Sequence, residues 1–456
     1  MCFLYFHDKI SISINIWRIF IIDTLKSERG TRIAYVINAA FEYFISLFVT
    51  GTMLGYLLDT VGFSDSLQGV LGTVATFTCG AQLFAIFLSE KRVKRICIAG
   101  NLINQICFII LYLFPFFDLS PKERTVILLI LLIGGHIINN VVSPSKIAMY
   151  MDSVQLNKRG SFTAIKEMIS LAGGIALSLV MGRIADIFRS TDGLPTKEYY
   201  VICAVALVVM TLIHTGSVVA ATEKNAPPAE KTSLKTTVKR IVKNTKFTKV
   251  VVVGILWNVT TALSISFFAS YLREELAFSF TQIALLTTIS SISRIIASPL
   301  LGKIADKYSF ATSMTISFGI AGAGFLAMVF TAPETKWLYI AYSCLYGIAM
   351  AGINSGVINL VYDYVGQRDR ATAMGFKNAI GGILAFFTAL LSGAVMDAVQ
   401  KREGFYIFGA RMYAQQMLSL FSLVMVILLI AYMRLVIFPL KRSEDVESAY
   451  NDADKS

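Results

Sequence analysis

Apolar residues fall into long blocks along most of the chain, and short polar links separate these blocks. A membrane-spanning helix needs roughly 20 consecutive, mainly apolar residues. Twelve stretches are long enough, six before a polar region near the middle of the chain and six after it. They predict an all-α integral membrane protein with twelve transmembrane helices. The predicted spans are residues 33–58, 66–89, 96–117, 124–151, 162–187, 198–222, 249–272, 280–303, 309–331, 336–363, 371–397 and 411–438.

The composition supports this prediction, because 55% of the residues are hydrophobic and only 15% are charged. Such a chain is not a soluble enzyme, a disordered protein or a disulfide-rich secreted domain. The 6 cysteines lie almost entirely in apolar blocks and the 3 histidines are scattered, so we expect no metal site and no cofactor. We found no phosphate-binding loop or hydrolase motif, so we expect neither an enzyme nor an ATP-driven pump.

The polar regions divide the chain into five predicted segments. Two prolines and a run of lysines mark the central region as a linker, and both a basic helix on lipid headgroups and a solvated tether fit it. The segments are a cytoplasmic lead (1–32), an N-terminal six-helix bundle (33–222), a basic cytoplasmic linker (223–248), a C-terminal six-helix bundle (249–438) and a cytoplasmic tail (439–456). The first 30 residues do not resemble a signal peptide, and an interfacial helix or an over-long start assignment would explain them.

The formal net charge of +12 has an uneven distribution across the predicted membrane. If the amino terminus is cytoplasmic, 26 of the 41 basic residues lie on the cytoplasmic side and 10 on the other. The positive-inside rule therefore places both termini in the cytoplasm. The basic character then reflects orientation in the bilayer and indicates no nucleic-acid partner.

The two halves of the chain share an internal repeat with an offset of 211 residues. Asp152, Arg159 and Lys166 are repeated as Asp363, Arg370 and Lys377, in the same position relative to the predicted spans. Two six-helix units of the same orientation indicate parallel repeats related by an axis along the membrane normal.

With this organisation the chain resembles the major facilitator superfamily over nearly its whole length. A family loop motif follows the eighth span as Gly302, Asp306 and Lys307, whereas the first half lacks the glycine and has Glu90 in place of the aspartate. The resemblance implies an alternating-access solute transporter with a central cavity lined by spans 1, 4, 7 and 10. The degraded first copy indicates that the inner gate differs between the halves.

The resemblance also implies that charges at the cytoplasmic edge form ion-pair networks that hold the outward-facing state. Loop solvation and orientation charge are the alternative explanation. The predicted gate residues are Glu90, Asp152, Arg159, Gly302, Asp306, Asp363 and Arg370.

Ionisable residues at membrane depth are costly unless paired or hydrated, so each one is a candidate for function. Glu42 belongs to a polar stripe on the first span that also contains Asn38. We interpret Glu42 as a coupling carboxylate or a substrate ligand, and a structural pair with a neighbouring helix is the alternative. Arg294, in the eighth span, would bind an anionic substrate or pair with Glu42 across the halves, unless it forms a permanent pair within its own half.

Other polar residues within the spans are weaker candidates. His136 lies near the centre of the fourth span and would carry a proton if hydrated, although packing residues of this type are common. Amide and phenol side chains suit a polar organic solute but also join helices to one another. The remaining predicted substrate or coupling residues are Asn140, Asn258, Tyr346 and Asn354.

These features predict a secondary active transporter for a polar organic solute, such as a sugar derivative or an organic acid. Its expected partners are that small-molecule solute, a co-transported proton or sodium ion and the lipid bilayer, and we expect a monomer in the bacterial inner membrane. A drug/proton efflux antiporter is the alternative, and the fifth span lacks the Gly-Pro pair typical of that class. A non-transporting nutrient receptor and a membrane-embedded enzyme fit the sequence less well.

Overall fold

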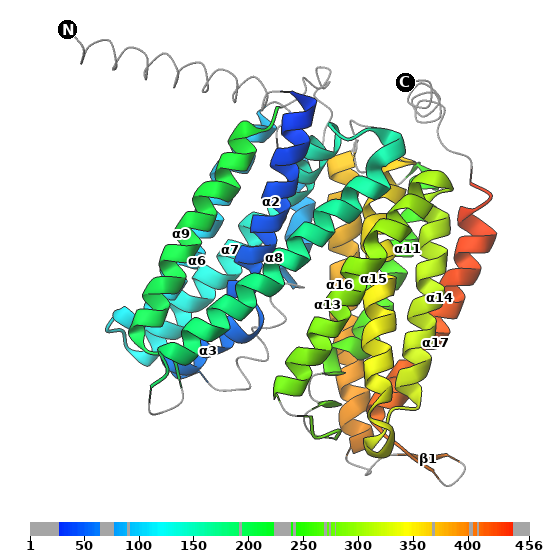
Figure 1. Ribbon diagram of the computed structural model, residues 1–456. Coiled ribbons are helices and arrows are strands. Elements are labelled where there is room, and N and C mark those ends of the chain that lie inside the picture. The colour runs from blue at the N-terminus through cyan, green and yellow to red at the C-terminus, as the bar shows by residue number, and fades with distance from the viewer. Residues whose placement is uncertain are drawn as a thin grey trace, which may run out of the picture.

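The computed structural model describes residues 27–63, 77–88, 92–190, 194–222, 239, 243–268, 271–272, 275–278, 280–366, 370–400, 405–407 and 410–440. These residues are almost entirely helical, and their helices form two groups (Figure 1). Among them, 11 helices are long and apolar enough to cross a membrane. The predicted all-α integral membrane fold class is confirmed.

The first group corresponds to the first six predicted spans. Its helices often begin where a side chain caps the free backbone N–H groups, as Ser27 does for Gly30 and Ser120 does in a capping box with Glu123. The elements are α2 (Glu28–Phe48), α3 (Gly51–Val61), η1 (Thr78–Phe87), α6 (Val93–Tyr112), η2 (Phe114–Phe116), α7 (Pro121–Met151), η3 (Leu156–Lys158), α8 (Arg159–Ile187) and α9 (Lys197–Ala220).

The second group corresponds to the last six predicted spans. Asn244 and Ser309 cap its first and third long helices in the same way. The elements are α11 (Thr245–Ser264), η4 (Ile265–Phe267), α13 (Phe280–Lys307), α14 (Phe310–Val329), η5 (Pro333–Thr335), α15 (Leu338–Tyr362), α16 (Arg370–Gln400), the antiparallel strands β1 (Phe405–Ile407) and β2 (Ala410–Met412), α17 (Ala414–Tyr432) and the π-helical η7 (Met433–Ile437).

The first predicted span, 33–58, lies within the candidate membrane span Glu28–Val61, but two helices form it in place of one. Thr50 has an extended backbone between α2 and α3. The hydroxyl of Ser46 donates to the carbonyl of Tyr43 at 2.6 Å, and that of Thr50 donates to the carbonyl of Ser46 at 2.8 Å. Hydroxyl side chains that bond to backbone carbonyls compete with the helical pattern, which fits a break at this point.

The second predicted span, 66–89, is described only at residues 77–88. Its described part contains η1, a 3-10 helix in place of the expected α-helix. This tighter helix lies against α7 of its own group and α16 of the other group.

Large apolar side chains cover the outer surface of both groups. Leu179 is 70% exposed, Ile130 64% and Leu435 77%. In water such a surface would be unfavourable, whereas lipid chains are as apolar as these side chains. The exposed apolar surface is therefore the lipid-facing surface.

The two groups meet through a few helices. Helix α8 packs against α13 and α15, while η1 and α7 pack against α16. Helix α2 begins and η7 ends at the same end of the molecule, and the helices of the two groups diverge toward the opposite end (Figure 1). We call the end where α2 begins the closed end, because Asp306 bonds to Gly160 and Arg370 pairs with Asp152 across the halves there.

Candidate functional site

Glu42 and Lys146 form an ion pair between α2 and α7. The Nζ atom of Lys146 lies 2.9 Å from Oε1 of Glu42. The Lys146 side chain is 1% exposed, whereas that of Glu42 is 33% exposed. Asn139 also forms a hydrogen bond to Glu42. Glu42 lies about 20 Å along α2 from its start, so this carboxylate is accessible near mid-span while a buried cation holds it.

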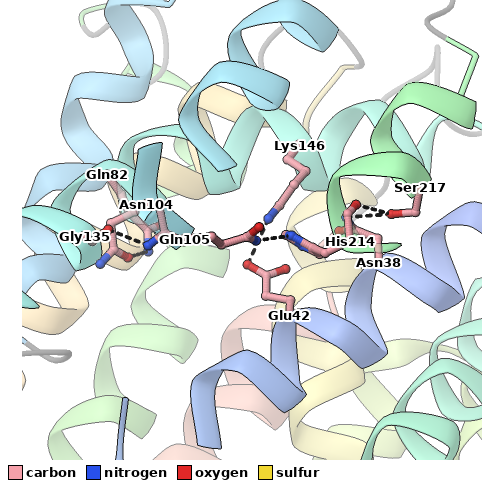
Figure 2. Close-up of polar contacts among 10 residues, drawn as sticks. Asn38, Glu42, Gln82, Asn104, Gln105, Gly135, Lys146, His214 and Ser217 are labelled. Carbon is pink, nitrogen blue, oxygen red and sulfur yellow. Dashed lines mark hydrogen bonds and ion pairs between the residues drawn. The ribbon is translucent and has the colours of Figure 1, made fainter. Parts of the chain in front are cut away.

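A second set of polar groups lies beside this ion pair and joins α2, α6 and α9 (Figure 2). The amide of Gln105 contacts Nδ1 of His214, whose ring lies close enough to Glu42 to interact electrostatically. Asn38 donates to the hydroxyl of Ser217 at 3.0 Å and to the carbonyl of His214 at 3.3 Å. The first half therefore has a buried polar core that fixes the helices around Glu42.

Arg294 and Glu167 form an ion pair between α13 and α8, and therefore between the two halves. The amide of Asn354 on α15 donates to Oε1 of Glu167 at 3.3 Å. The predicted alternative in which Arg294 pairs with Glu42 was wrong. Helix α8 packs against both α2 and α13, so Glu167 is the carboxylate that meets Arg294, while Glu42 pairs with Lys146.

Two of the predicted polar residues on α15 lie near Arg294. Asn354 contacts its partner Glu167, and Tyr346 is close enough to interact electrostatically with the guanidinium. Tyr346 also stacks on Tyr342, with ring centroids 5.4 Å apart. These groups together give the α8–α13–α15 junction a cation, a carboxylate, an amide and a phenol.

Asn140 lies in a chain of hydrogen bonds that also crosses between the halves. It donates to the hydroxyl of Thr78 at 3.1 Å and accepts from Gln82 at 2.8 Å. Gln82 in turn accepts from Asn378 on α16 at 2.7 Å. Asn378 lies 211 positions after Glu167, so the repeat places a neutral amide where the other half has a carboxylate.

The side chains of Asn258 and His136 lie against neighbouring helices of their own halves. A Cβ atom at Gly381 of α16 would be 2.5 Å from the amide nitrogen of Asn258, so this residue fills the space between α11 and α16. The ring of His136 lies 5.4 Å from that of Phe108 on α6. Their roles in substrate binding or coupling stay predictions.

Asp306, at the closed end, binds the N-terminus of α8. Its Oδ1 accepts the backbone N–H of Gly160 at 2.7 Å, and its Oδ2 accepts the N–H and hydroxyl of Ser161 at 2.8 and 2.5 Å. A helix N-terminus carries free N–H groups and a partial positive charge, which a carboxylate satisfies. The family loop motif of the second half thus holds the first half by capping a helix.

Gly302, also from the loop motif, lets the backbones of α13 and α8 approach closely at this point. A Cβ atom on Gly302 would lie 2.8 Å from the carbonyl oxygen of Gly160, and one on Gly160 would lie 2.5 Å from that of Gly302. Both positions need glycine because any side chain would separate the helices and lengthen the bonds to Asp306.

Asp152 and Arg370 form an ion pair across the halves at the closed end, with Nη1 3.0 Å from Oδ1. The guanidinium groups of Arg370 and Arg159 both lie over the ring of Tyr362, at 5.0 and 5.6 Å. Asp363 is buried beside this group at 2% exposure. Of the predicted gate residues, Glu90 lies outside the described residues.

Glu167, Lys146, His214 and Gln82 were missed as candidates. Glu167 follows Lys166 inside a predicted span, and the reasoning that an ionisable residue at membrane depth is functional would have identified it. His214 lies within the sixth span and carried the same signal. Gln82 carried only the weak signal of a polar residue in an apolar stretch.

A membrane protein with two repeated six-helix halves and ion pairs in its interior has the architecture of a solute transporter. The chain belongs to the Major Facilitator Superfamily, whose sequence profile matches residues 36–271 and 253–448. The resemblance inferred from the loop motif and the repeat is confirmed. Members of this family are transporters, not enzymes.

Three known proteins illustrate the likeness. Human monocarboxylate transporter 6 is 28% identical over 119 residues. This match spans 26% of this chain and only 24% of that relative. A bacterial homologue of the iron transporter ferroportin, in an outward-facing state, has a TM-score of 0.62 and 14% identity over 89% of this chain and 98% of its own. The E. coli fucose:proton symporter has a TM-score of 0.65 and 12% identity over 88% and 97%. The two structural likenesses establish the fold.

Proposed function

We propose that this protein is a secondary active transporter that moves a polar organic solute, a sugar derivative or an organic acid, coupled to a proton or cation gradient. The observation that carries the proposal is the Arg294–Glu167 ion pair, which joins the two halves within the membrane. Burying such a pair is costly and adds little stability, so its presence suits a protein whose halves break and remake it. The names of the monocarboxylate and fucose relatives agree with the two solute classes.

Alternating access requires one end of the transporter to close while the other opens. The bonds of Asp306 to α8 and the Asp152–Arg370 ion pair support a closed state at the end where α2 begins. The positive-inside rule assigns that end to the cytoplasm, which makes the described state outward-facing. Two similar solved structures are also described as outward-facing or outward.

As the sequence predicts, we assign the protein to the bacterial inner membrane as a monomer.

Labelling of single cysteines tests this orientation. In a variant without native cysteines, Glu334→Cys places a thiol between α14 and α15, and Lys158→Cys places one between α7 and α8. We expect a membrane-impermeant maleimide to label position 334 and not position 158 in intact cells. Labelling of position 158 alone in intact cells would show that the protein has the opposite orientation. As a control, both positions should be labelled in permeabilised cells.

We assign Glu42 the role of a solute ligand. A third of its side chain is exposed, and the buried Lys146 keeps it charged and oriented, which leaves an oxygen to accept hydrogen bonds from solute hydroxyls. A hydrogen bond to a charged group contributes about 1.5–3 kcal/mol. Glu42→Gln is therefore expected to lower the initial rate of uptake at low solute concentration about 10- to 100-fold.

Proteoliposomes containing the purified full-length protein test the proposed function. Radiolabelled fucose, lactate and glucuronate serve as probes under an imposed pH or sodium gradient, with protein-free liposomes as the reference for passive entry. We expect gradient-driven accumulation of at least one probe and a reduced rate for Glu42→Gln. The exposed Glu334→Gln is the matched control and should keep the wild-type rate. If no gradient drives uptake of any probe, the proposed function is wrong.

A further inference from the structure

The Arg294–Glu167 ion pair has hydrogen-bonding groups that remain unused. Within the part of the chain that the structure describes, Oε2 of Glu167 and Nε of Arg294 are buried without a hydrogen-bond partner. Oε1 of Glu167, by contrast, receives both Arg294 and Asn354. Buried polar atoms in native proteins are nearly always satisfied, so these two atoms have the capacity to bond to a further group that enters the junction.

The polar and charged groups around the pair come from α2, α8 and α15. Tyr43 of α2 and Tyr346 of α15 lie near the guanidinium of Arg294. On α8 itself, the amine of Lys166 lies over an aromatic ring of α2 at 5.0 Å. Among the described groups, Arg294 is therefore the cation that contacts Glu167 directly.

The two partners differ in how accessible they are. The side chain of Arg294 is 24% exposed, whereas that of Glu167 is 9% exposed. A solute that reaches the junction therefore meets the guanidinium first, and Glu167 is the buried member of the pair.

We propose that the transported solute is an organic anion whose carboxylate replaces Glu167 on Arg294, and that the displaced Glu167 takes up the coupled proton. This inference rests on the proposed function and deepens it, because it names the solute class and the proton-binding residue. Only a group of equal charge can take the place of Glu167 without leaving the guanidinium unpaired within the membrane. A planar carboxylate also fits the two parallel donors of a guanidinium.

Displacement leaves Glu167 buried, with the neutral amide of Asn354 as its remaining contact. A carboxylate in that position is far less costly when protonated, so a proton from the water on the open side forms an O–H bond on Glu167. On the other side of the membrane the anion and the proton leave, and Glu167 returns to Arg294. One anion and one proton cross together, and the cycle moves no net charge.

This balance sets the accumulation that the experiment measures. For one proton per anion, each unit of an imposed pH gradient, alkaline inside, accumulates the anion about tenfold in proteoliposomes. We expect this ratio for lactate or glucuronate with the wild-type protein, after subtraction of entry into protein-free liposomes. An inside-positive potential should not change the wild-type ratio.

Glu167→Gln mimics the protonated residue and separates the anion from the proton. We expect this variant to show no accumulation under the pH gradient, but about tenfold accumulation for 59 mV of inside-positive potential, because it carries the anion alone. Glu42→Gln should be slower yet keep the wild-type ratio, which distinguishes the two carboxylates. Arg294→Gln should abolish anion uptake, and Arg294→Lys should retain it with a higher KM, which a purely structural role of Arg294 would not produce.

Four results would overturn this inference. If the Glu167→Gln variant still accumulates lactate or glucuronate under the pH gradient, another residue carries the coupled proton. Uptake of neutral fucose that neither anion inhibits shows that the solute is not an anion, although gradient-driven fucose uptake would still support the proposed function. If Arg294→Lys is as inactive as Arg294→Gln, and both variants are monodisperse in detergent, the positive charge at position 294 is not what binds the anion. If none of the three probes enters, both the inference and the proposed function are wrong.

Discussion

Replacement of Lys146 by methionine is expected to destabilise the folded protein by about 2–4 kcal/mol. The lysine is almost fully buried and lies 2.9 Å from Glu42, so its loss leaves a carboxylate in the membrane interior with a hydrogen bond from Asn139 but no counter-ion. The expected effect lies below that of a fully buried pair because a third of the Glu42 side chain is exposed. The midpoint of thermal unfolding in detergent measures the change.

Two further variants separate the charge from the loss of side-chain volume. Lys146→Met combined with Glu42→Gln removes both charges and should recover most of the lost stability, because a buried ion pair replaced as a whole costs little. The exposed Lys158→Met should leave the midpoint unchanged. A double variant as unstable as Lys146→Met would show that packing, rather than charge, explains the first result.

Substitution of Gly160 by alanine is expected to lower the rate of solute uptake about tenfold while the protein stays folded. The new methyl group would lie 2.5 Å from the carbonyl oxygen of Gly302 and 2.7 Å from Oδ1 of Asp306. Crowding of this kind costs about 1–3 kcal/mol, and it falls on the closed state because these contacts join the halves. A cost of about 1.4 kcal/mol changes the population of that state tenfold.

Gly182 provides a matched control on the same helix. A Cβ atom at Gly182 has no neighbour within 4 Å, so Gly182→Ala should leave uptake unchanged and should slightly favour the helix. Initial uptake rates in proteoliposomes and unfolding midpoints in detergent are compared for both variants. Equal uptake by Gly160→Ala and Gly182→Ala would mean that the close approach of α8 and α13 does not limit the cycle.

Most of the fold followed from the sequence because a bilayer restricts what a chain can do. Long apolar stretches must be helical there, since every backbone group has to be bonded within its own helix. The fifth predicted span, 162–187, lies within the observed Arg159–Ile187. The break at Thr50 escaped prediction because it depends on which way two hydroxyls turn, and hydrophobic periodicity does not record that.

The sequence identified one member of each ion pair in the candidate site but not its partner. Glu42 and Arg294 were identified because each is a costly residue at membrane depth. Their partners are far away in sequence, since Lys146 is 104 positions from Glu42, and only the packing of α2 on α7 and α8 on α13 determines which charges meet. The repeat gave no help here, because Glu167 and its counterpart Asn378 differ in charge.

That difference between Glu167 and Asn378 has a kinetic consequence. The contact between Gln82 and Asn378 is neutral, and such a bond can be exchanged for bonds to water at a net cost of about 0.5–1.5 kcal/mol. The Arg294–Glu167 ion pair, at the other contact between the halves, is held more strongly in a low dielectric. We therefore expect the two interfaces between the halves to separate at different times within one cycle, with the interface of α8 and α13 separating later.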